Sequence, residues 1–92
     1  MLKLEGNDII RDGEKIGWLD GYHLYLHNGK KVGYFQGTII YDENADKIAY
    51  ISGDVLYDRD GNQKLHLEEI NDVIEGILPS IGKAAIYVLL GD

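Results

Sequence analysis

The stretch GYHLYLHNGKKVGYFQ, residues 21–36, is followed by GTIIYDENADKIAYIS at 37–52 and by GDVLYDRDGNQKLHLE at 53–68. These sixteen-residue segments align glycine on glycine and tyrosine on tyrosine, and the aligned positions are Gly21, Gly37, Gly53 and Tyr25, Tyr41, Tyr57. A third column extends the pattern toward the N-terminus and holds Trp18, Tyr34, Tyr50 and His66. A fixed period of this kind indicates units that cannot bury their apolar faces alone and must pack against their neighbours. The repeat therefore predicts an architecture and specifies no chemistry.

Two turn signals recur in the copies. The first is Asp12-Gly13, Asn28-Gly29 and Asp60-Gly61, a pair typical of the type I′ hairpin turn. The third copy has Asn44-Ala45-Asp46 instead, and we expect a different or longer turn there because alanine adopts the left-handed region at a cost. The second signal closes one unit and opens the next: Asp20-Gly21, Gln36-Gly37 and Ser52-Gly53. Between the turns, segments rich in β-branched and aromatic residues predict successive antiparallel hairpins.

Two further segments carry a resemblance to a known family. GKKVGYFQG at 29–37 with IYD at 40–42, and KIAYISGD at 47–54 with LYD at 56–58, resemble the repeat of the 4-fold β-flower domains. The resemblance covers roughly residues 6–67 and implies four two-stranded hairpins arranged as petals about a pseudo-fourfold axis. As far as the resemblance goes, the family has no assigned activity, so it implies no catalytic residue. Apolar residues on both faces of the strands also favour a ring over a flat meander.

The repeat ends near His66, and from there the period of two residues that is typical of strands no longer occurs. A helical stripe is predicted from five apolar residues at helical spacing, which are Ile70, Val73, Ile74, Ile77 and Leu78. The following apolar run, residues 84–90, is either a buried strand or a second short helix; we favour a helix because Ala84 and Ala85 open the run and Ser80 can cap it. We thus expect one domain that is mainly β with a C-terminal helix: a four-hairpin β-repeat at 1–67 and a helical, apolar segment at 68–92.

The C-terminal segment has two possible places. It can fold back and plug its own ring, or it can meet its copy on a partner subunit, because seven consecutive apolar residues are hard to hide in so small a domain. We expect self-association, with a dimer as the commonest case. The candidate interface residues are Ile70, Val73, Ile74, Ile77, Leu78, Ile86, Val88, Leu89 and Leu90.

Composition narrows the classes of partner. Nine basic against sixteen acidic side chains give a net charge of −7, which repels nucleic acid and anionic membrane surfaces. There is no cysteine, so disulfides and thiolate metal sites are excluded, and without a cleavable apolar leader we expect a cytoplasmic protein. The apolar run at 84–90 is far shorter than the roughly 20 residues that span a bilayer.

The polar residues predict no reaction. His23 and His27 differ by four positions, but in a strand this spacing does not bring two metal ligands together. The segment DRDGN at 58–62 is similar to part of a calcium loop, yet it lacks the ligand spacing and the closing glutamate. We expect no catalytic residue, cofactor or metal, and regard a small hydrolase using turn carboxylates as the weaker alternative.

The aromatic residues are the candidates for ligand contact: Trp18, Tyr25, Tyr34, Tyr41, Tyr50 and Tyr57. They can serve as cross-strand pairs that hold the sheet together, or they can line a groove where a flat ligand stacks. The sequence therefore predicts a non-enzymatic interaction or assembly module that self-associates. The alternative is a small-molecule binding protein that uses its repeated tyrosines between petals or at a subunit interface.

Overall fold

Strands of the repeat pair in sequence order to form one curved sheet around a central helix. The computed structural model describes residues 2–90. Its ten-stranded sheet has the order β10-β1-β2-β3-β4-β5-β6-β7-β8-β9. The strands are β1 (Leu2–Glu5), β2 (Asp8–Arg11), β3 (Glu14–Asp20), β4 (His23–Leu26), β5 (Lys31–Gln36), β6 (Ile39–Asp42), β7 (Lys47–Ser52), β8 (Val55–Asp58), β9 (Gln63–His66) and β10 (Ile74–Glu75). The helices are α1 (Leu67–Val73) and α2 (Ser80–Leu90).

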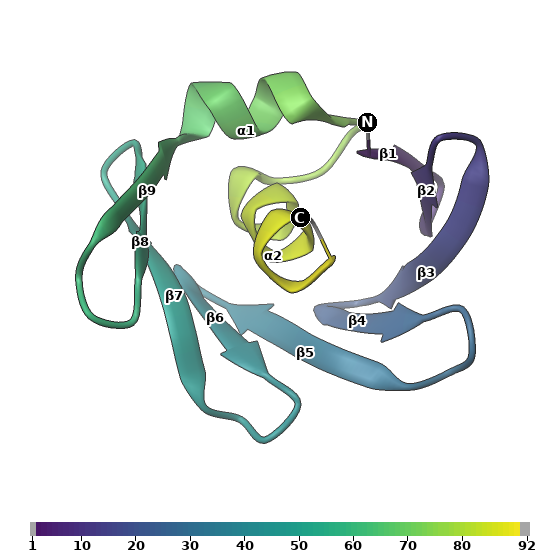
Figure 1. Cartoon of the computed structure of the whole chain (residues 1–92), viewed down its shortest axis with the longest axis horizontal. Coiled ribbons are helices and arrows are strands. Elements are labelled where there is room, and N and C mark those ends of the chain that lie inside the picture. Colours follow the sequence, from purple (N-terminus) through teal and green to yellow (C-terminus); the bar gives the residue numbers. More distant parts are fainter. Residues whose placement is uncertain (1, 91–92) are drawn as a thin grey trace.

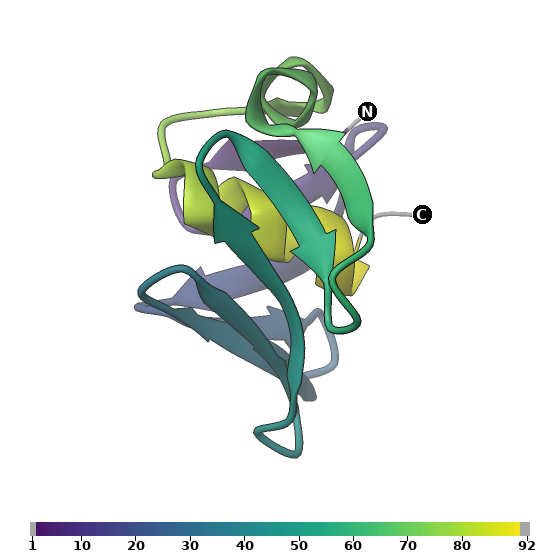
Figure 2. The ribbon, with the colours of Figure 1, turned by 90° about the vertical axis from the view of Figure 1, so that its left-hand side faces the viewer.

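The hairpins follow one another around α2, which occupies the centre of the ring, and α1 lies across the opening between β9 and β1 (Figure 1). Seen from the side, α2 runs between α1 and the hairpins of the second and third copies (Figure 2). The prediction of a mainly β fold with a C-terminal helix is confirmed. Neither helix described within residues 2–90 has the length and apolar character needed to span a bilayer.

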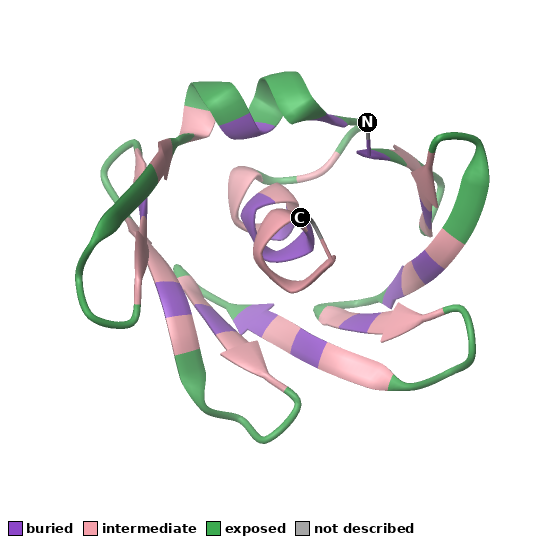
Figure 3. Cartoon of the chain, viewed as in Figure 1, coloured by how far each residue is buried: buried purple, intermediate pink, exposed green. Residues whose placement is uncertain are grey.

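Inward-facing positions of the repeat build the core together with α2. Each hairpin contributes one large side chain that is at most 1% exposed, and these are Ile9, Leu24, Ile40 and Leu56. Their cross-strand partners in the first three copies are the small residues Gly17, Gly33 and Ala49. In the fourth copy the partner is Leu65. From the centre, α2 adds Ala84, Ala85 and Ile86, three consecutive buried residues that point in different directions because the helix is enclosed on several sides. The buried residues accordingly lie on the inner side of the ring and on α2, while the hairpin tips are exposed (Figure 3).

Two strand glycines, Gly17 and Gly33, lie where other atoms approach the backbone closely. A Cβ atom at Gly17 would lie 2.1 Å from the carbonyl oxygen of Tyr25. One at Gly33 would lie 2.3 Å from the carbonyl oxygen of Tyr41 and 2.8 Å from Cδ1 of Leu89 on α2. The absence of a side chain lets neighbouring strands approach each other at both glycines. At Gly33 it also lets Leu89 of the central helix approach the sheet.

A β-bulge recurs once per copy and bends the sheet. In each pairing of a short strand with the next long one, the register skips one residue. The skipped residues are Ile16, Val32, Ile48 and Lys64. A bulge bends its strand and increases the local twist, so four bulges at one repeat position curl the sheet around α2. The three apolar residues pack against the core, whereas Lys64 is exposed in the last copy.

The predicted type I′ turn occurs in the first copy alone. Asp12 and Gly13 both have positive φ, 51° and 84°, whereas in the second and fourth copies only the glycine does. Three-residue loops replace the type I′ turn there, closed in the second copy by a hydrogen bond from the Leu26 N–H to the Lys30 carbonyl. The third copy also has a turn longer than type I′, as expected, but its loop matches those of the second and fourth copies, and Ala45 adopts the left-handed region with a φ of 66°. The first copy is one residue shorter in this region, which leaves room for only two loop residues.

The predicted stripe from Ile70 to Leu78 is not one helix. Helix α1 ends at Val73, and the next two residues form β10, which pairs in parallel with β1 through Leu2 and Ile74. Gly76 then adopts a φ of 135° and turns the chain toward α2. The exposed edge of β1 offers hydrogen-bond partners that helix continuation would leave unused, and this tertiary pairing overrides the local pattern. The expected helix at 84–90 is confirmed, and it begins at Ser80.

Candidate functional site

Aromatic residues of neighbouring strands stack in pairs on the outer face of the sheet. The ring centroids of Trp18 and Tyr25 are 5.4 Å apart and their planes differ by 12°. The next copy stacks Tyr34 on Tyr41 at 4.8 Å and 14°, and the third stacks Tyr50 on Tyr57 at 5.3 Å and 15°. All six rings are half-buried. The structure thus brings the predicted aromatic candidates together within each copy.

In each aromatic pair, the ammonium group of a lysine lies over one of the two rings. The Nζ atoms of Lys15, Lys31 and Lys47 are 5.4, 5.0 and 4.4 Å from the centroids of Trp18, Tyr34 and Tyr50 respectively. Strand pairing also sets Lys31 opposite Tyr25 and Lys47 opposite Tyr41, so each of these two lysines joins two aromatic pairs, whereas Lys15 lies opposite Ile10. We call this continuous row the aromatic–lysine ladder: Lys15, Trp18, Tyr25, Lys31, Tyr34, Tyr41, Lys47, Tyr50 and Tyr57.

The ladder limits how a ligand can bind. One face of every ring lies on its stacked partner, and an ammonium group lies within 5.4 Å of the ring centroids of Trp18, Tyr34 and Tyr50. A flat ligand therefore cannot enter between the rings of a pair without separating them. The ladder instead presents ring edges, phenol groups and lysine side chains.

The three lysines of the ladder differ in whether a carboxylate pairs with them. Lys15 Nζ lies 3.1 Å from a carboxylate oxygen of Asp8. For Lys31 and Lys47, no ion pair with a carboxylate is found among residues 2–90. Their ammonium groups interact with tyrosine rings alone, in a protein where acidic side chains outnumber basic ones. The middle of the ladder thus presents two ammonium groups that no described carboxylate pairs with, on an acidic molecule.

The ladder stops in the fourth copy. His66 takes the ladder position of Trp18, Tyr34 and Tyr50, and it pairs across the strands with Val55. Its Nε2 atom lies 3.2 Å from the side-chain amide nitrogen of Gln63, which itself faces Tyr57 where the other copies have a lysine. The departure of His66 from the repeat therefore marks the end of the aromatic row.

The predicted interface residues separate into three groups. Ile70, Ile74 and Ile86 are at most 1% exposed and belong to the core of their own chain. Four others are half-buried and pack against this core: Leu78, Val88, Leu89 and Leu90. Val73 and Ile77 are different, because 42% and 100% of their surfaces are exposed. Most of the apolar tail plugs its own ring, and only these two residues are left as large exposed apolar groups of that set.

Exposed carboxylates surround these two residues. Helix α1 and the segment after it carry four exposed acidic residues, and no lysine or arginine occurs between Lys64 and Lys83. Val73 lies four residues after Glu69 on α1, a spacing that places both on one face of the helix. We call this surface the α1 patch, which consists of Glu68, Glu69, Asp72, Val73, Glu75 and Ile77.

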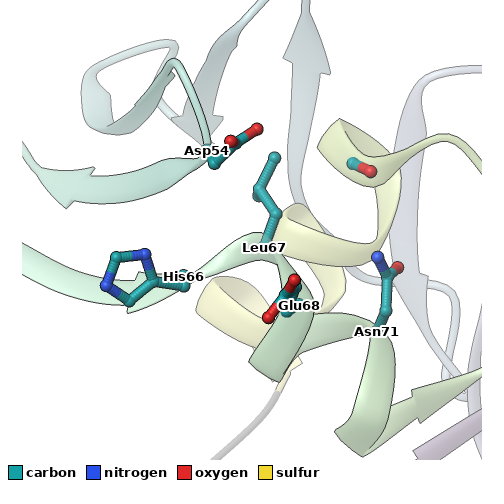
Figure 4. Close-up of a pocket in the computed structure, with 6 residues that line it drawn as sticks. Asp54, His66, Leu67, Glu68 and Asn71 are labelled. Atoms are coloured by element: carbon teal, nitrogen blue, oxygen red, sulfur yellow. The ribbon is translucent and has the colours of Figure 1, made fainter.

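A polar hollow lies where β9 passes into α1. It has a volume of about 420 Å³ and is lined by Asp54, His66, Leu67, Glu68, Asn71 and Ser80. Polar groups of Asp54, Glu68 and Asn71 gather around it (Figure 4). The Leu67 N–H donates a hydrogen bond to the Asp54 carbonyl, and the Leu19 N–H bonds to Asn7 in the same way in the first copy. This hydrogen bond recurs in the repeat, but the hollow also needs Glu68 and Asn71 of α1 and Ser80 of α2, so sequence reasoning on the repeat missed it.

The turn carboxylates are engaged by their own loops. Asp58 Oδ1 accepts hydrogen bonds from the N–H groups of Asp60 and Asn62, at 2.9 and 3.0 Å, and Asp42 does the same for Asn44 and Asp46. The N–H of Asn62 is the main reason that the pKa of Asp58 lies below its ordinary value. Within residues 2–90, no three histidine or acidic side chains gather in a way that could hold a metal ion.

The chain was compared with protein families, curated proteins and solved structures. The model of the 4-fold beta flower protein family matches residues 10–76. No curated protein and no solved structure matches the chain.

Proposed function

Because the chain belongs to the 4-fold beta flower protein family, and this membership carries no activity to inherit, we propose from its surface that it is a non-enzymatic assembly module that binds further copies of itself. The observation that carries the proposal is Ile77, a large aliphatic side chain that is fully exposed. The second exposed aliphatic residue, Val73, belongs to the same short stretch of chain. Both lie in the segment between the repeat and the central helix.

The energetics favour a contact at this place. Complete burial of a side chain such as isoleucine is worth about 1.5–3 kcal/mol. Since Ile77 contributes nothing to the core of its own chain, this free energy is available only to a partner. Two aliphatic side chains with polar surroundings are a small centre for an interface, so the association is expected to be concentration-dependent rather than obligate.

Sedimentation velocity over a range of protein concentrations tests the proposal. The natural protein should show a species larger than the monomer that grows with concentration, and Ile77→Ser should shift the population toward the monomer. Tyr22→Ser is the matched control, because Tyr22 is 66% exposed and lies in the β3–β4 turn. A natural protein that remains monomeric at every concentration would count against self-association.

A second candidate function, binding of a small molecule, is favoured by the hollow next to Asp54. Its volume of about 420 Å³ falls within the roughly 300–1,000 Å³ of known ligand pockets. Native mass spectrometry of freshly purified protein should then show an adduct that is lost in Asp54→Ala and retained in Tyr41→Ala, because Tyr41 does not line the hollow. A spectrum without an adduct, together with no thermal shift across a metabolite panel, would contradict this candidate.

A further inference from the structure

We propose that the α1 patch of one copy binds the aromatic–lysine ladder of another, so that copies associate head to tail. The inference rests on the proposed self-association and names the surface that receives Ile77. The partner that binds the ladder is a second copy of this chain.

The charge of the α1 patch argues against a symmetric contact. Each patch contains four exposed carboxylates, and Lys3, which lies opposite Glu75 across β1 and β10, already has Glu5 as an ion-pair partner at 3.7 Å. A two-fold interface would bring two such patches together, with like charges facing one another across the contact. The aliphatic residues Val73 and Ile77 are therefore better received by a surface that is positive and apolar at once.

The middle of the ladder has both properties. Lys31 and Lys47 have no carboxylate partner among residues 2–90, so an incoming carboxylate would break no existing ion pair. Between these lysines lie the stacked rings of Tyr34 and Tyr41, which are half-buried and offer apolar edges to an aliphatic side chain. Charge complementarity and apolar contact thus coincide on one surface, as in the centres of many protein interfaces.

The spacing of the charges is compatible with this contact. Lys31 on β5 and Lys47 on β7 are two strands apart, about 10 Å across the sheet, and the register sets Lys47 level with Tyr34, so the stagger along the strands raises their separation to about 12–14 Å. Glu68 and Asp72 are four residues apart on α1, which corresponds to about 6 Å between Cβ atoms. Flexible lysine and glutamate side chains cover the difference, so two carboxylates of α1 can reach two lysines of the ladder.

The two surfaces lie on opposite sides of the ring. Helix α1 is separated from β5 and β6 by the central helix α2 in both views (Figures 1 and 2). The patch and the ladder of one chain therefore cannot meet each other, and each must bind a different copy. A contact between two different surfaces is heterologous, and it produces either a closed ring or an open chain of subunits.

Mixing two variants tests this arrangement. Ile77→Ser weakens the patch and keeps the ladder, whereas the double variant Lys31→Glu/Lys47→Glu reverses the ladder and keeps the patch. Each variant alone should be monomeric, with an association at least about tenfold weaker than that of the natural protein. The mixture should form a one-to-one heterodimer, because the intact patch of the ladder variant can bind the intact ladder of the other. Added salt should weaken the heterodimer, since charge pairs at its edge are screened.

The control is a second double reversal with the same change in net charge. Lys30→Glu/Arg59→Glu alters two exposed loop residues outside the ladder, so it should still assemble. Thermal unfolding of both double variants verifies that the fold is retained after the lysine–ring contacts are lost.

Three outcomes separate the claims. A natural protein that is monomeric at all concentrations overturns the proposed function and this inference together. A ladder variant that assembles like the natural protein leaves self-association intact and overturns the inference. Variants that are monomeric alone and also fail to form a heterodimer when mixed show that the intact patch does not bind the intact ladder, and they too overturn the head-to-tail arrangement.

Discussion

Ile86 and Ile77 are the same residue type in opposite environments, and truncating each one tests whether the central helix fills its own ring. Ile86 is 1% exposed on α2, whereas Ile77 is fully exposed in the connection before it. We predict that Ile86→Ala destabilises the protein strongly and that Ile77→Ala leaves its stability nearly unchanged.

The magnitude follows from the enclosure of α2. Truncation of a buried isoleucine to alanine costs about 2–5 kcal/mol, and the cost is higher where the surroundings cannot collapse into the cavity. Because the curved sheet and α1 surround α2, we expect about 3–5 kcal/mol for Ile86→Ala. A domain of 92 residues has a total stability of roughly 5–14 kcal/mol, so the loss is a large share of it. The exposed Ile77→Ala should change stability by no more than about 0.5 kcal/mol.

Urea unfolding followed by the fluorescence of Trp18, the single tryptophan, measures both values. The expected thermal counterpart is a midpoint lowered by at least about 12 °C for Ile86→Ala, at roughly 4–8 °C per kcal/mol for a domain of this size. If the two variants had equal stabilities, α2 would not form the core of its own ring, and the reasoning from burial would be refuted.

Three further predictions concern the repeat itself. Gly17→Ala should lower the free energy of unfolding by about 1–3 kcal/mol, because its Cβ would lie 2.1 Å from the Tyr25 carbonyl oxygen; an unchanged urea midpoint would contradict this close approach. Ala45→Gly should raise the thermal midpoint by the equivalent of about 0.5–1 kcal/mol, since glycine adopts a φ of 66° without steric cost, whereas Ala84→Gly inside α2 should lower it. Folding lowers the pKa of Asp58, so the ionised carboxylate stabilises the folded protein above the pKa that Asp58 has in the unfolded chain, and this stabilisation is lost as the pH falls through the folded pKa. The variant Asp58→Asn should therefore show a weaker dependence of stability on pH in that acidic range. Equal slopes of stability against pH for the two proteins would refute the assignment.

The turns show where closer reading of the sequence would have sufficed. The Asp-Gly and Asn-Gly pairs predict tight turns at the right places, but their type depends on how many residues separate the strands. The first copy has one residue fewer between its two glycines, Gly6 and Gly13, than the second copy has between Gly21 and Gly29. That difference distinguishes the two-residue turn at Asp12 from the three-residue loops of the other copies.

The C-terminal segment shows a different kind of miss. Spacing along the chain predicts one helix through Ile77, because the pattern of apolar residues is locally helical. The edge of β1 lies seventy residues away in sequence and supplies hydrogen bonds that make Ile74 a strand residue. The helix therefore ends at Val73, and Ile77 is left in solvent. No local pattern contains this information.

The sequence by itself determined the repeat, its hairpins, the aromatic columns and the helical end of the chain, because these follow from turn chemistry and from the period of the side chains. Only the tertiary structure decided which face each column occupies, since the recurring bulge and the central helix set the direction in which the sheet curls. That curvature sends the leucine and isoleucine column inward and the tyrosines outward beneath their lysines. Most of the apolar tail fills the inside of the ring, because the short strands alone cannot supply enough side chains for a core. Ile77 remains exposed.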